Sequence, residues 1–225
     1  RPGTTIVDMG STSPYVIQEL HAAAVEKGFY VVSDEIYEKL IYDGEEHVSI
    51  ASLGEDIFRQ TIVINGVSKS YAMTGWRLGY ACAPELILKQ MLKIHQFAIM
   101  CAPTTSQYAA VEALKNGDKD VAEMRGAYDQ RRRYLVKALR DMGFDCYEPQ
   151  GAFYVFPSIK KFGMTSDEFA LKLLEEEKVA VVPGTAFGDC GEGYLRISYA
   201  YSLEDLKKAL DRMEIFIQEL REEKN

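Results

Sequence analysis

Short apolar segments separated by helical patterns constrain the fold of this chain more than any other feature. Three such segments, each bounded by turn-forming residues, lie at Phe29–Val32, Thr61–Ile64 and Leu78–Ala83. Apolar residues at helical spacing cover 15–27 and 85–97. Strands that alternate with helices in this way predict an α/β layer with a mainly parallel sheet. The first segment is short and continuously apolar, so we expect it to form a strand buried on both faces.

Local signals mark the ends of these elements. Gly28 follows the first helical pattern, and glycine is common just beyond a helix because it accepts a left-handed backbone conformation. Residues 1–14 are rich in Gly, Ser, Thr and Pro and are expected to be loop, with a short strand at Ile6–Val7. A further helix is expected over 104–116.

The composition changes after Gly117, and this change predicts two domains. Residues 1–117 would form part of a large α/β domain, and residues 118–225 would form a small α+β domain. The chain of 225 residues is long enough to bury a sizeable core in such an arrangement.

The second domain is expected to begin with a long helix that is capped by Asp118 and reaches about Met142. A capping box at Thr165–Glu168 opens another helix, and Ser202 opens the last. The expected strands are at 144–147, 153–156, 179–182 and 194–199.

Charge and cysteine content argue against several classes of function. The chain has 34 acidic and 26 basic side chains, for a net charge of −8, which argues against a nucleic-acid partner. The only basic run, Arg131–Arg133, follows a helical pattern and is expected on a mostly solvated helix face. The four cysteines include no CxxC pair and the three histidines are scattered, so we expect neither a metal site nor a disulfide scaffold.

The sequence gives no sign of a membrane or secretory protein. No apolar stretch approaches the ~20 residues of a membrane span. No signal peptide opens the chain. We therefore expect a cytoplasmic location and no membrane partner.

Two stretches carry side chains that suggest chemistry. Lys69 lies between Ser68 and Ser70 directly after an apolar segment, and Arg77 follows in a glycine-containing stretch. Asp34 follows another apolar segment at the carboxyl end of a predicted strand, where open α/β sheets bind their ligands.

Each of these residues also has an ordinary structural interpretation. Lys69 could be a loop lysine that follows a buried strand, and Asp34 could be a helix cap. Tyr37 could be one of the fourteen tyrosines that serve in packing. Glu35 and Glu38 are expected to be solvated or structural.

The order of these segments resembles that of the class I/II aminotransferases, which are fold-type-I enzymes that use pyridoxal 5'-phosphate (PLP). The resemblance covers the chain from roughly Tyr15 to its C-terminus, and it implies part of the large PLP-binding domain followed by the complete small domain. Members of this family are longer, so this chain is expected to lack their N-terminal half. The matching patterns are Val31–Tyr37, Val67–Tyr80, Pro149–Tyr154, Val182–Gly188 and Arg196–Ser198.

The resemblance implies a role for each candidate in the first domain. Lys69 would form a Schiff base with the cofactor, and Asp34 would keep the pyridine nitrogen protonated. Tyr37 would hydrogen-bond the 3-oxygen of the cofactor. Ser68 and Arg77 would bind its phosphate.

In the second domain the resemblance singles out Arg196, which would bind the α-carboxylate of the substrate through its planar guanidinium. The alternative is an arginine that faces water from an edge strand, since a buried one needs a partner. The loops within 149–154 and 182–188 would shape the mouth of the site.

The activity that the resemblance implies is transfer of an amino group between an amino acid, by default aspartate, and a 2-oxo acid. Related PLP lyases share the same residues. A truncated, non-catalytic fragment that acts as a folding or dimerising unit is a further alternative. Active sites of the family form at a subunit interface, so we expect a homodimer or a complex with the missing N-terminal half. Helix 85–97 is apolar around much of its circumference and is expected to be buried on several sides, in an interface or else by its own chain.

Overall fold

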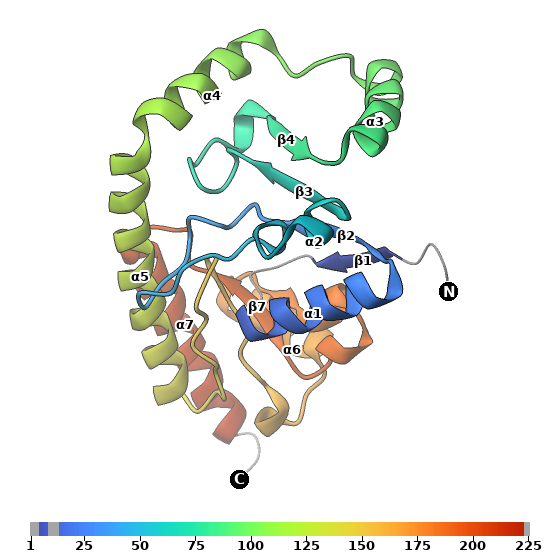
Figure 1. The fold of residues 1–225 in the computed structure, drawn as a ribbon. Helices are drawn as coiled ribbons and strands as arrows, with labels where there is room; N and C mark the ends of the chain where they lie inside the picture. The colour runs from blue at the N-terminus through green and yellow to red at the C-terminus, as the bar shows by residue number, and fades with distance from the viewer. Residues whose placement is uncertain (1–4, 9–13, 223–225) are drawn as a thin grey trace. The chain divides into compact units, whose positions relative to one another are not determined.

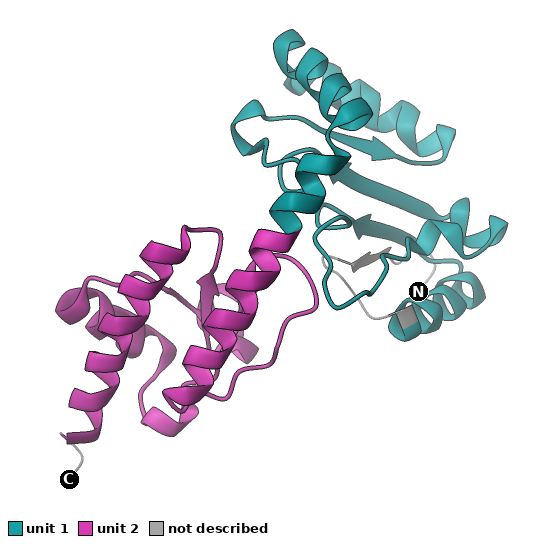
Figure 2. Cartoon of the chain, turned by 90° about the vertical axis from the view of Figure 1, so that its left-hand side faces the viewer, with its two compact units in different colours: residues 1–125 teal, residues 126–225 magenta. Residues whose placement is uncertain are grey.

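The structure is a computed structural model that describes residues 5–8 and 14–222. The chain divides into two compact units, residues 1–125 and 126–225, which Figure 2 colours separately. The division falls inside a long helix, α5 (Asp118–Asp141), whereas the sequence pattern places the domain boundary at Gly117.

Unit 1 is built on a four-stranded sheet with the strand order β1-β2-β3-β4 (Figure 1). Strands β1, β2 and β3 run parallel to one another, and β4 runs antiparallel to β3. The mainly parallel sheet expected from the sequence is confirmed, and the strand expected at Ile6–Val7 is part of it. Residues 1–4 and 9–13, expected to be loop, lie outside the described residues. The strands are β1 (Thr5–Asp8), β2 (Tyr30–Asp34), β3 (Thr61–Gly66) and β4 (Gly79–Cys82).

The first helix, α1 (Pro14–Lys27), ends where the sequence predicts. Gly28 has a φ of 65°, and the backbone N–H of Phe29 reaches back to the carbonyl of Ala24 at 2.9 Å. A Cβ added to Gly28 would meet nothing within 4 Å, so the left-handed conformation rather than space is what requires glycine here.

A hydrophobic core joins α1 to the sheet and to two short elements, η1 (Ile50–Ser52) and α2 (Glu55–Phe58). Because a four-residue helix cannot be stable alone, α2 depends on this packing. The buried members of the core are Ile17, Ala24, Val31, Ile50 and Ile57.

The expectation that 29–32 forms a strand buried on both faces is wrong. In β2, Val31 and Ser33 are buried, Val32 and Asp34 are half-buried, and Tyr30 is exposed. Successive side chains of a strand point to opposite faces, and the core described above contains only the Val31 face.

The helix α3 (Glu85–Ala98) is not covered by its own chain. None of its residues is buried, and Phe97 is 96% exposed. The alternative in which helix 85–97 is wrapped entirely by its own chain is therefore wrong within the described residues. Across residues 5–8 and 14–222, no helix is long and apolar enough to cross a membrane. The other large apolar side chains exposed on α3 are Leu86, Leu88, Leu92 and Ile94.

Unit 2 contains a small antiparallel sheet with the strand order β5-β7-β6. The strands expected at 153–156 and 194–199 are present in shortened form. The expectation of a strand at 144–147 is wrong, because only the single bridge Asp145–Ser158 forms there. The strand expected at 179–182 begins only at Val182. The three strands are β5 (Tyr154–Val155), β6 (Val182–Pro183) and β7 (Leu195–Ser198).

Two helices of unit 2 begin at the predicted caps. Thr165 and Glu168 form a reciprocal capping box at α6 (Ser166–Glu177). Ser202 accepts a hydrogen bond from the backbone of Asp205 at the start of α7 (Leu203–Glu222). Asp118, by contrast, is the first residue of α5 and not its cap. The side chains that α7 buries are Leu206, Leu210, Met213, Phe216, Ile217 and Leu220.

The expectation of a solvated face at Arg131–Arg133 is wrong for its central residue. The Arg132 side chain is fully buried. Its Nε and Nη2 donate to Oδ1 of Asp129 at 2.9 and 2.7 Å, and its Nη1 donates to the carbonyl of Pro149 at 2.7 Å. A buried guanidinium needs such acceptors. The carbonyl of Pro149 lies seventeen positions along the chain, so helical periodicity could not predict this contact.

Candidate active site

The strand pairings of unit 1 bring five predicted site residues to one edge of the sheet. Asp34 ends β2 and pairs with Ile64 of the parallel strand β3. Ser68 and Lys69 follow the end of β3. The antiparallel strand β4 begins at this same edge, where Gly79 pairs with Gly66, so Arg77 also lies there. Tyr37 belongs to the turns that follow β2.

The loop that carries Lys69 is closed by its own backbone. The N–H groups of Tyr71 and Met73 both donate to the carbonyl of Val67, at 3.2 and 3.3 Å. Val67 and Met73 are buried in a small core with Ala110 of α4 (Thr104–Asn116). Lys69 itself is half-buried. The buried side chains of Val67 and Met73 therefore anchor the loop, while the side chain of Lys69 remains partly exposed.

A second loop, which contains Asp34 and Tyr37, is tied to the lysine loop. The buried hydroxyl of Ser70 donates to the carbonyl of Ile36 at 3.4 Å. Oδ1 of Asp34 accepts the backbone N–H of Ile36 at 3.1 Å. Asp34 and Tyr37 are both half-buried.

Arg77 occupies a strained backbone position. Its φ of 53° and ψ of 50° place it in the left-handed region, which side chains with a Cβ rarely adopt. Nη1 donates to the carbonyl of Thr74 at 2.7 Å, and the residue is exposed. The preceding carbonyl, that of Trp76, accepts the hydroxyl of Ser106 at 2.6 Å. Such strain is common where a side chain is aimed at a ligand.

The pairing of Gly66 with Gly79 allows β3 and β4 to approach closely beside the two loops. A Cβ on Gly66 would lie 2.9 Å from the Cα of Gly79 and 3.0 Å from the carbonyl oxygen of Leu78. Both contacts are with backbone, so neither can give way cheaply.

Gly66→Ala is therefore expected to lower the free energy of unfolding by about 1–3 kcal/mol through overpacking. Gly75→Ala is the matched control, because a Cβ there would meet nothing within 4 Å. Urea denaturation followed by the fluorescence of Trp76 measures both variants. Equal stability of the two variants would contradict the argument.

A second lysine near this edge, Lys39, is already engaged by other side chains. It donates to Asp118 at 3.2 Å and lies 5.6 Å from the ring centroid of Tyr71. Burial by itself would lower its pKa, but hydrogen bonds with Asp118 and Tyr71 outweigh burial and raise the pKa above its ordinary value. A lysine acts on carbonyl compounds as the neutral amine, so Lys39 is the poorer candidate.

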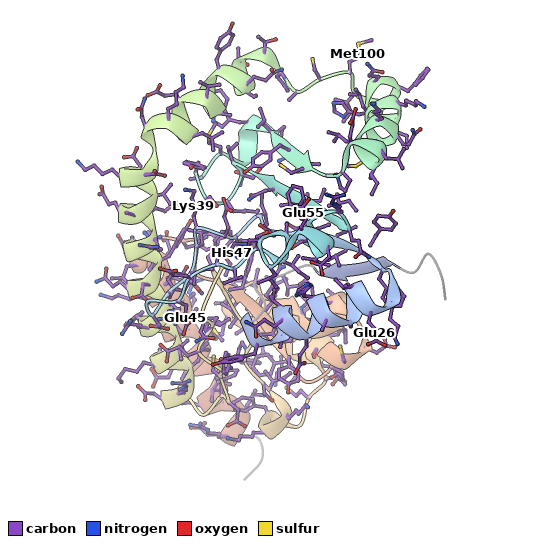
Figure 3. The ribbon with its side chains drawn as sticks, in the orientation of Figure 1. Glu26, Lys39, Glu45, His47, Glu55 and Met100 are labelled. Carbon is purple, nitrogen blue, oxygen red and sulfur yellow. The ribbon has the colours of Figure 1, made fainter. Side chains whose placement is uncertain are left out.

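Glu35 is the functional candidate that the sequence pattern did not single out. Its side chain is buried, and its two oxygens have three partners. Oε1 accepts the hydroxyls of Ser33 at 3.1 Å and Ser49 at 2.6 Å, and Oε2 lies 3.1 Å from Nε2 of His47. His47, labelled in Figure 3, belongs to the segment between β2 and η1.

Glu38 joins Glu35 and His47 in the one group of three potential metal donors found among the described residues, with all donor atoms within 4.8 Å of one another. Glu35, however, already accepts two hydroxyls and pairs with His47. Glu35 and Glu38 are three positions apart, but His47 lies nine positions further along the chain, so the sequence pattern did not point to this cluster. The expectation of no bound metal stays a prediction.

The surroundings of Glu35 predict a pH dependence of stability. Burial alone would raise its pKa, but hydrogen bonds with His47 and Ser49, the charge of His47 and the Ser33 hydroxyl lower it below the ordinary 4.5. The pKa of Glu35 is lower in the folded chain than in the unfolded chain. The ionised Glu35 therefore contributes its full stabilisation above the unfolded pKa, and this stabilisation is lost as the pH falls through the folded pKa. Glu35→Gln should therefore destabilise the chain more at pH 6 than at pH 3. Urea denaturation at both pH values checks this, and an equal effect at both would refute it.

In unit 2, Arg196 lies on β7 and pairs with Val182 of β6. It is half-buried, and its guanidinium carbon lies 4.6 Å from the ring centroid of Tyr154 and 4.5 Å from that of Phe187. Cation–π contact with two rings restricts the position of the guanidinium. The two rings come from the segments 149–154 and 182–188 that the sequence marked as shaping elements.

Comparison with known proteins extends over nearly the whole chain. A family model of class I and II aminotransferases matches residues 12–213. A putative aminotransferase, YugH, of Bacillus subtilis (strain 168) is 53% identical over 201 residues, which are 89% of this chain and 52% of the relative. An aspartate aminotransferase of Pyrococcus abyssi (strain GE5 / Orsay) is 50% identical over 205 residues, which are 90% of this chain and 52% of that protein.

A solved structure agrees with these sequence matches. The crystal structure of an aromatic aminotransferase from Pyrococcus horikoshii OT3 has a TM-score of 0.93 and 44% identity, and it covers 97% of this chain and 61% of its own. This chain spans about half the length of the curated relatives it matches. The family match covers most of its residues, and the chain belongs to the class I and II aminotransferases.

Proposed function

We propose that the protein transfers an amino group between an amino acid and a 2-oxo acid with PLP as its cofactor. The observation that carries the proposal is the gathering of an amine, a carboxylate, two hydroxyls and a guanidinium at the carboxyl edge of one sheet. Open α/β sheets bind ligands at this edge. Family membership supports the same reaction.

The residues at this edge fit the groups of the cofactor. When bound, PLP supplies an electron-withdrawing ring that stabilises negative charge at the Cα of an amino acid. Asp34 would pair with the pyridine nitrogen through its carboxylate, whose Oδ1 also accepts the N–H of Ile36. Tyr37 would donate to the 3-oxygen. Ser68 and Arg77 would bind the phosphate, as a hydroxyl and a cation do at many phosphate sites.

Lys69 is the proposed covalent anchor and the proposed base. Its loop is anchored by the buried Val67 and Met73, which fix the backbone that carries it. The amine of Lys69 would hold the cofactor covalently and, when free, would be the base that moves the proton from the substrate Cα. Arg196 would bind the α-carboxylate, and its cation–π contact with Tyr154 and Phe187 supports that assignment.

The relatives do not agree on one amino-acid donor. Two of the relatives are named as an aspartate and an aromatic aminotransferase, at 50% and 44% identity. Aspartate is the default donor for the first assay. We also propose a cytoplasmic location, which the four free cysteines support because thiols persist in reducing compartments.

Assembly follows from the uncovered surface of α3. Apolar side chains exposed over most of a helix favour a protein contact. We propose that this surface is covered in a homodimer, or by the N-terminal half that the relatives carry. Sedimentation velocity at micromolar concentration tests the first possibility.

The cofactor proposal is tested by adding PLP to the chain, alone and together with the N-terminal half of a relative. Binding should give a visible absorbance band, and borohydride should fix the cofactor on Lys69, as peptide mass spectrometry would show. Absence of the band in both samples would reject catalysis and favour a non-catalytic folding unit. Release of carbon dioxide or ammonia without need for a 2-oxo acid would instead identify a PLP lyase.

A further inference from the structure

We propose that Glu35 is a positioning residue, which fixes the backbone that carries Asp34 and Tyr37 through its hydrogen bond with Ser49 and its contact with His47. The inference rests on the proposed function for its effect on the cofactor, but its structural part stands without it. Glu35 would not touch cofactor or substrate.

Glu35 points away from the face of the sheet that Asp34 occupies. Side chains alternate along an extended strand, and the burial of β2 follows this rule, with Val31 and Ser33 on the buried side. Glu35 continues the buried side, and its own N–H donates to the carbonyl of Ile64 in β3 at 2.8 Å. Asp34 and Glu35 therefore point to opposite faces of the sheet. Asp34 lies on the proposed ligand side, and Glu35 lies on the core side.

Two of the three partners of Glu35, His47 and Ser49, come from the segment that precedes η1. Ser49 is the residue before η1, whose first residue, Ile50, is buried in the core with Ile17 and Val31. The carboxylate therefore joins the end of β2 to a segment that the core already holds. A buried carboxylate is tolerated only when its oxygens are satisfied, so the hydrogen bond from the Ser49 hydroxyl (2.6 Å) and the approach of Nε2 of His47 (3.1 Å) restrict the carboxylate.

The backbone after Asp34 forms turns next to Glu35, and it is also held by the Ser70 hydroxyl, which donates to the carbonyl of Ile36 at 3.4 Å. Two backbone hydrogen bonds close these turns. The N–H of Glu38 donates to the carbonyl of Glu35 at 3.0 Å, and the N–H of Leu40 donates to the carbonyl of Tyr37 at 2.8 Å. The first of these bonds begins at Glu35 itself. If the Glu35 side chain loses its anchors, the turns loosen and the orientation of Asp34 and Tyr37 is lost with them.

The test compares Glu35→Gln with Thr61→Val in the full chain. Glutamine keeps the size of the side chain but removes the charge. Thr61 is an equally buried polar residue at the opposite end of β3, where its hydroxyl donates to the carbonyl of Ile57 at 2.8 Å. Ser49→Ala, which removes one bond and keeps the charge, is the milder second variant should Glu35→Gln fail to fold.

Hydrogen exchange of the free chain gives the first measurement. Exchange of the Glu38 and Leu40 amides should become about tenfold faster in Glu35→Gln, and faster to a smaller extent in Ser49→Ala, while Thr61→Val leaves them unchanged. A merely structural role would raise exchange at these two amides no more than at the other amides of unit 1. Unchanged exchange at the two amides, or a rise no larger there than elsewhere in unit 1, would overturn the proposal.

PLP titration gives the second measurement. The apparent Kd for PLP should rise about tenfold in Glu35→Gln and stay the same in Thr61→Val. If the unmodified chain binds no PLP, the proposed function fails while the exchange measurement still decides this inference. If Zn²⁺ protects the 35–40 amides in the unmodified chain and not in Glu35→Gln, the cluster is a metal site and the positioning role is rejected.

Discussion

Replacing Lys69 with alanine is expected to abolish borohydride-stable labelling by PLP and to remove nearly all amino transfer. The loss of a positioned base alone lowers a rate by roughly 10²–10⁴-fold. Loss of the covalent anchor adds to this. Lys69 is half-buried in a loop whose apolar anchors, Val67 and Met73, are untouched by the change. The far-UV circular dichroism of the variant should therefore match that of the unmodified chain.

Two further variants separate chemistry from charge. Lys69→Arg keeps the positive charge, yet its guanidinium stays protonated and cannot form the imine, so it should be as inactive as the alanine variant. Lys93→Ala, on the exposed surface of α3, is the matched control and should be labelled normally at Lys69. Activity retained in Lys69→Ala, or label found mainly on Lys39, would reject the assignment of the catalytic lysine.

Arg132→Met is expected to lower the stability of unit 2 by about 3–5 kcal/mol, the usual effect of removing one partner of a buried ion pair. The side chain is fully buried, and its loss strands the carbonyl of Pro149 and part of the Asp129 carboxylate. Methionine fills much of the volume but accepts and donates no comparable bond. Urea denaturation followed by circular dichroism measures the change.

The neighbouring Arg133 offers an unusually close control. It bonds to the same Asp129, with Nε 3.0 Å from Oδ2, but its side chain is 59% exposed. Arg133→Met should change stability by no more than about 1 kcal/mol, as exposed ion pairs do. The single tryptophan, Trp76, is in unit 1, so its fluorescence reports on that unit separately. Similar losses in the two arginine variants would contradict the role given to burial.

The sequence alone predicted the elements whose signals are local. The stop at Gly28 and the capping box at Thr165–Glu168 depend on residues within one helical turn, and both form as expected. The strands of unit 1 are also evident as apolar segments. Their edge could be proposed as a binding site because parallel strands present their carboxyl ends together, and Asp34 and Lys69 each lie at or just beyond such an end.

Short strands and buried polar groups were harder to predict. The segment 144–147 has the composition of a strand, but one bridge at Asp145 is all that pairs, because a strand requires a partner as well as a pattern. Arg132 matched a solvated helix face by its spacing, yet it is buried because its acceptor, Pro149, is seventeen positions away.

The sequence by itself therefore determined the helix ends, the main strands, the family resemblance and the list of candidate catalytic residues. Only the tertiary structure decided which polar side chains are buried together. The network of Glu35 with Ser49 and His47, and the cation–π contact of Arg196 with Tyr154 and Phe187, each join residues from separate segments. The physical reason is that capping and periodicity depend on neighbours along the chain, whereas a buried charge depends on whatever donors the fold brings within about 3 Å of it.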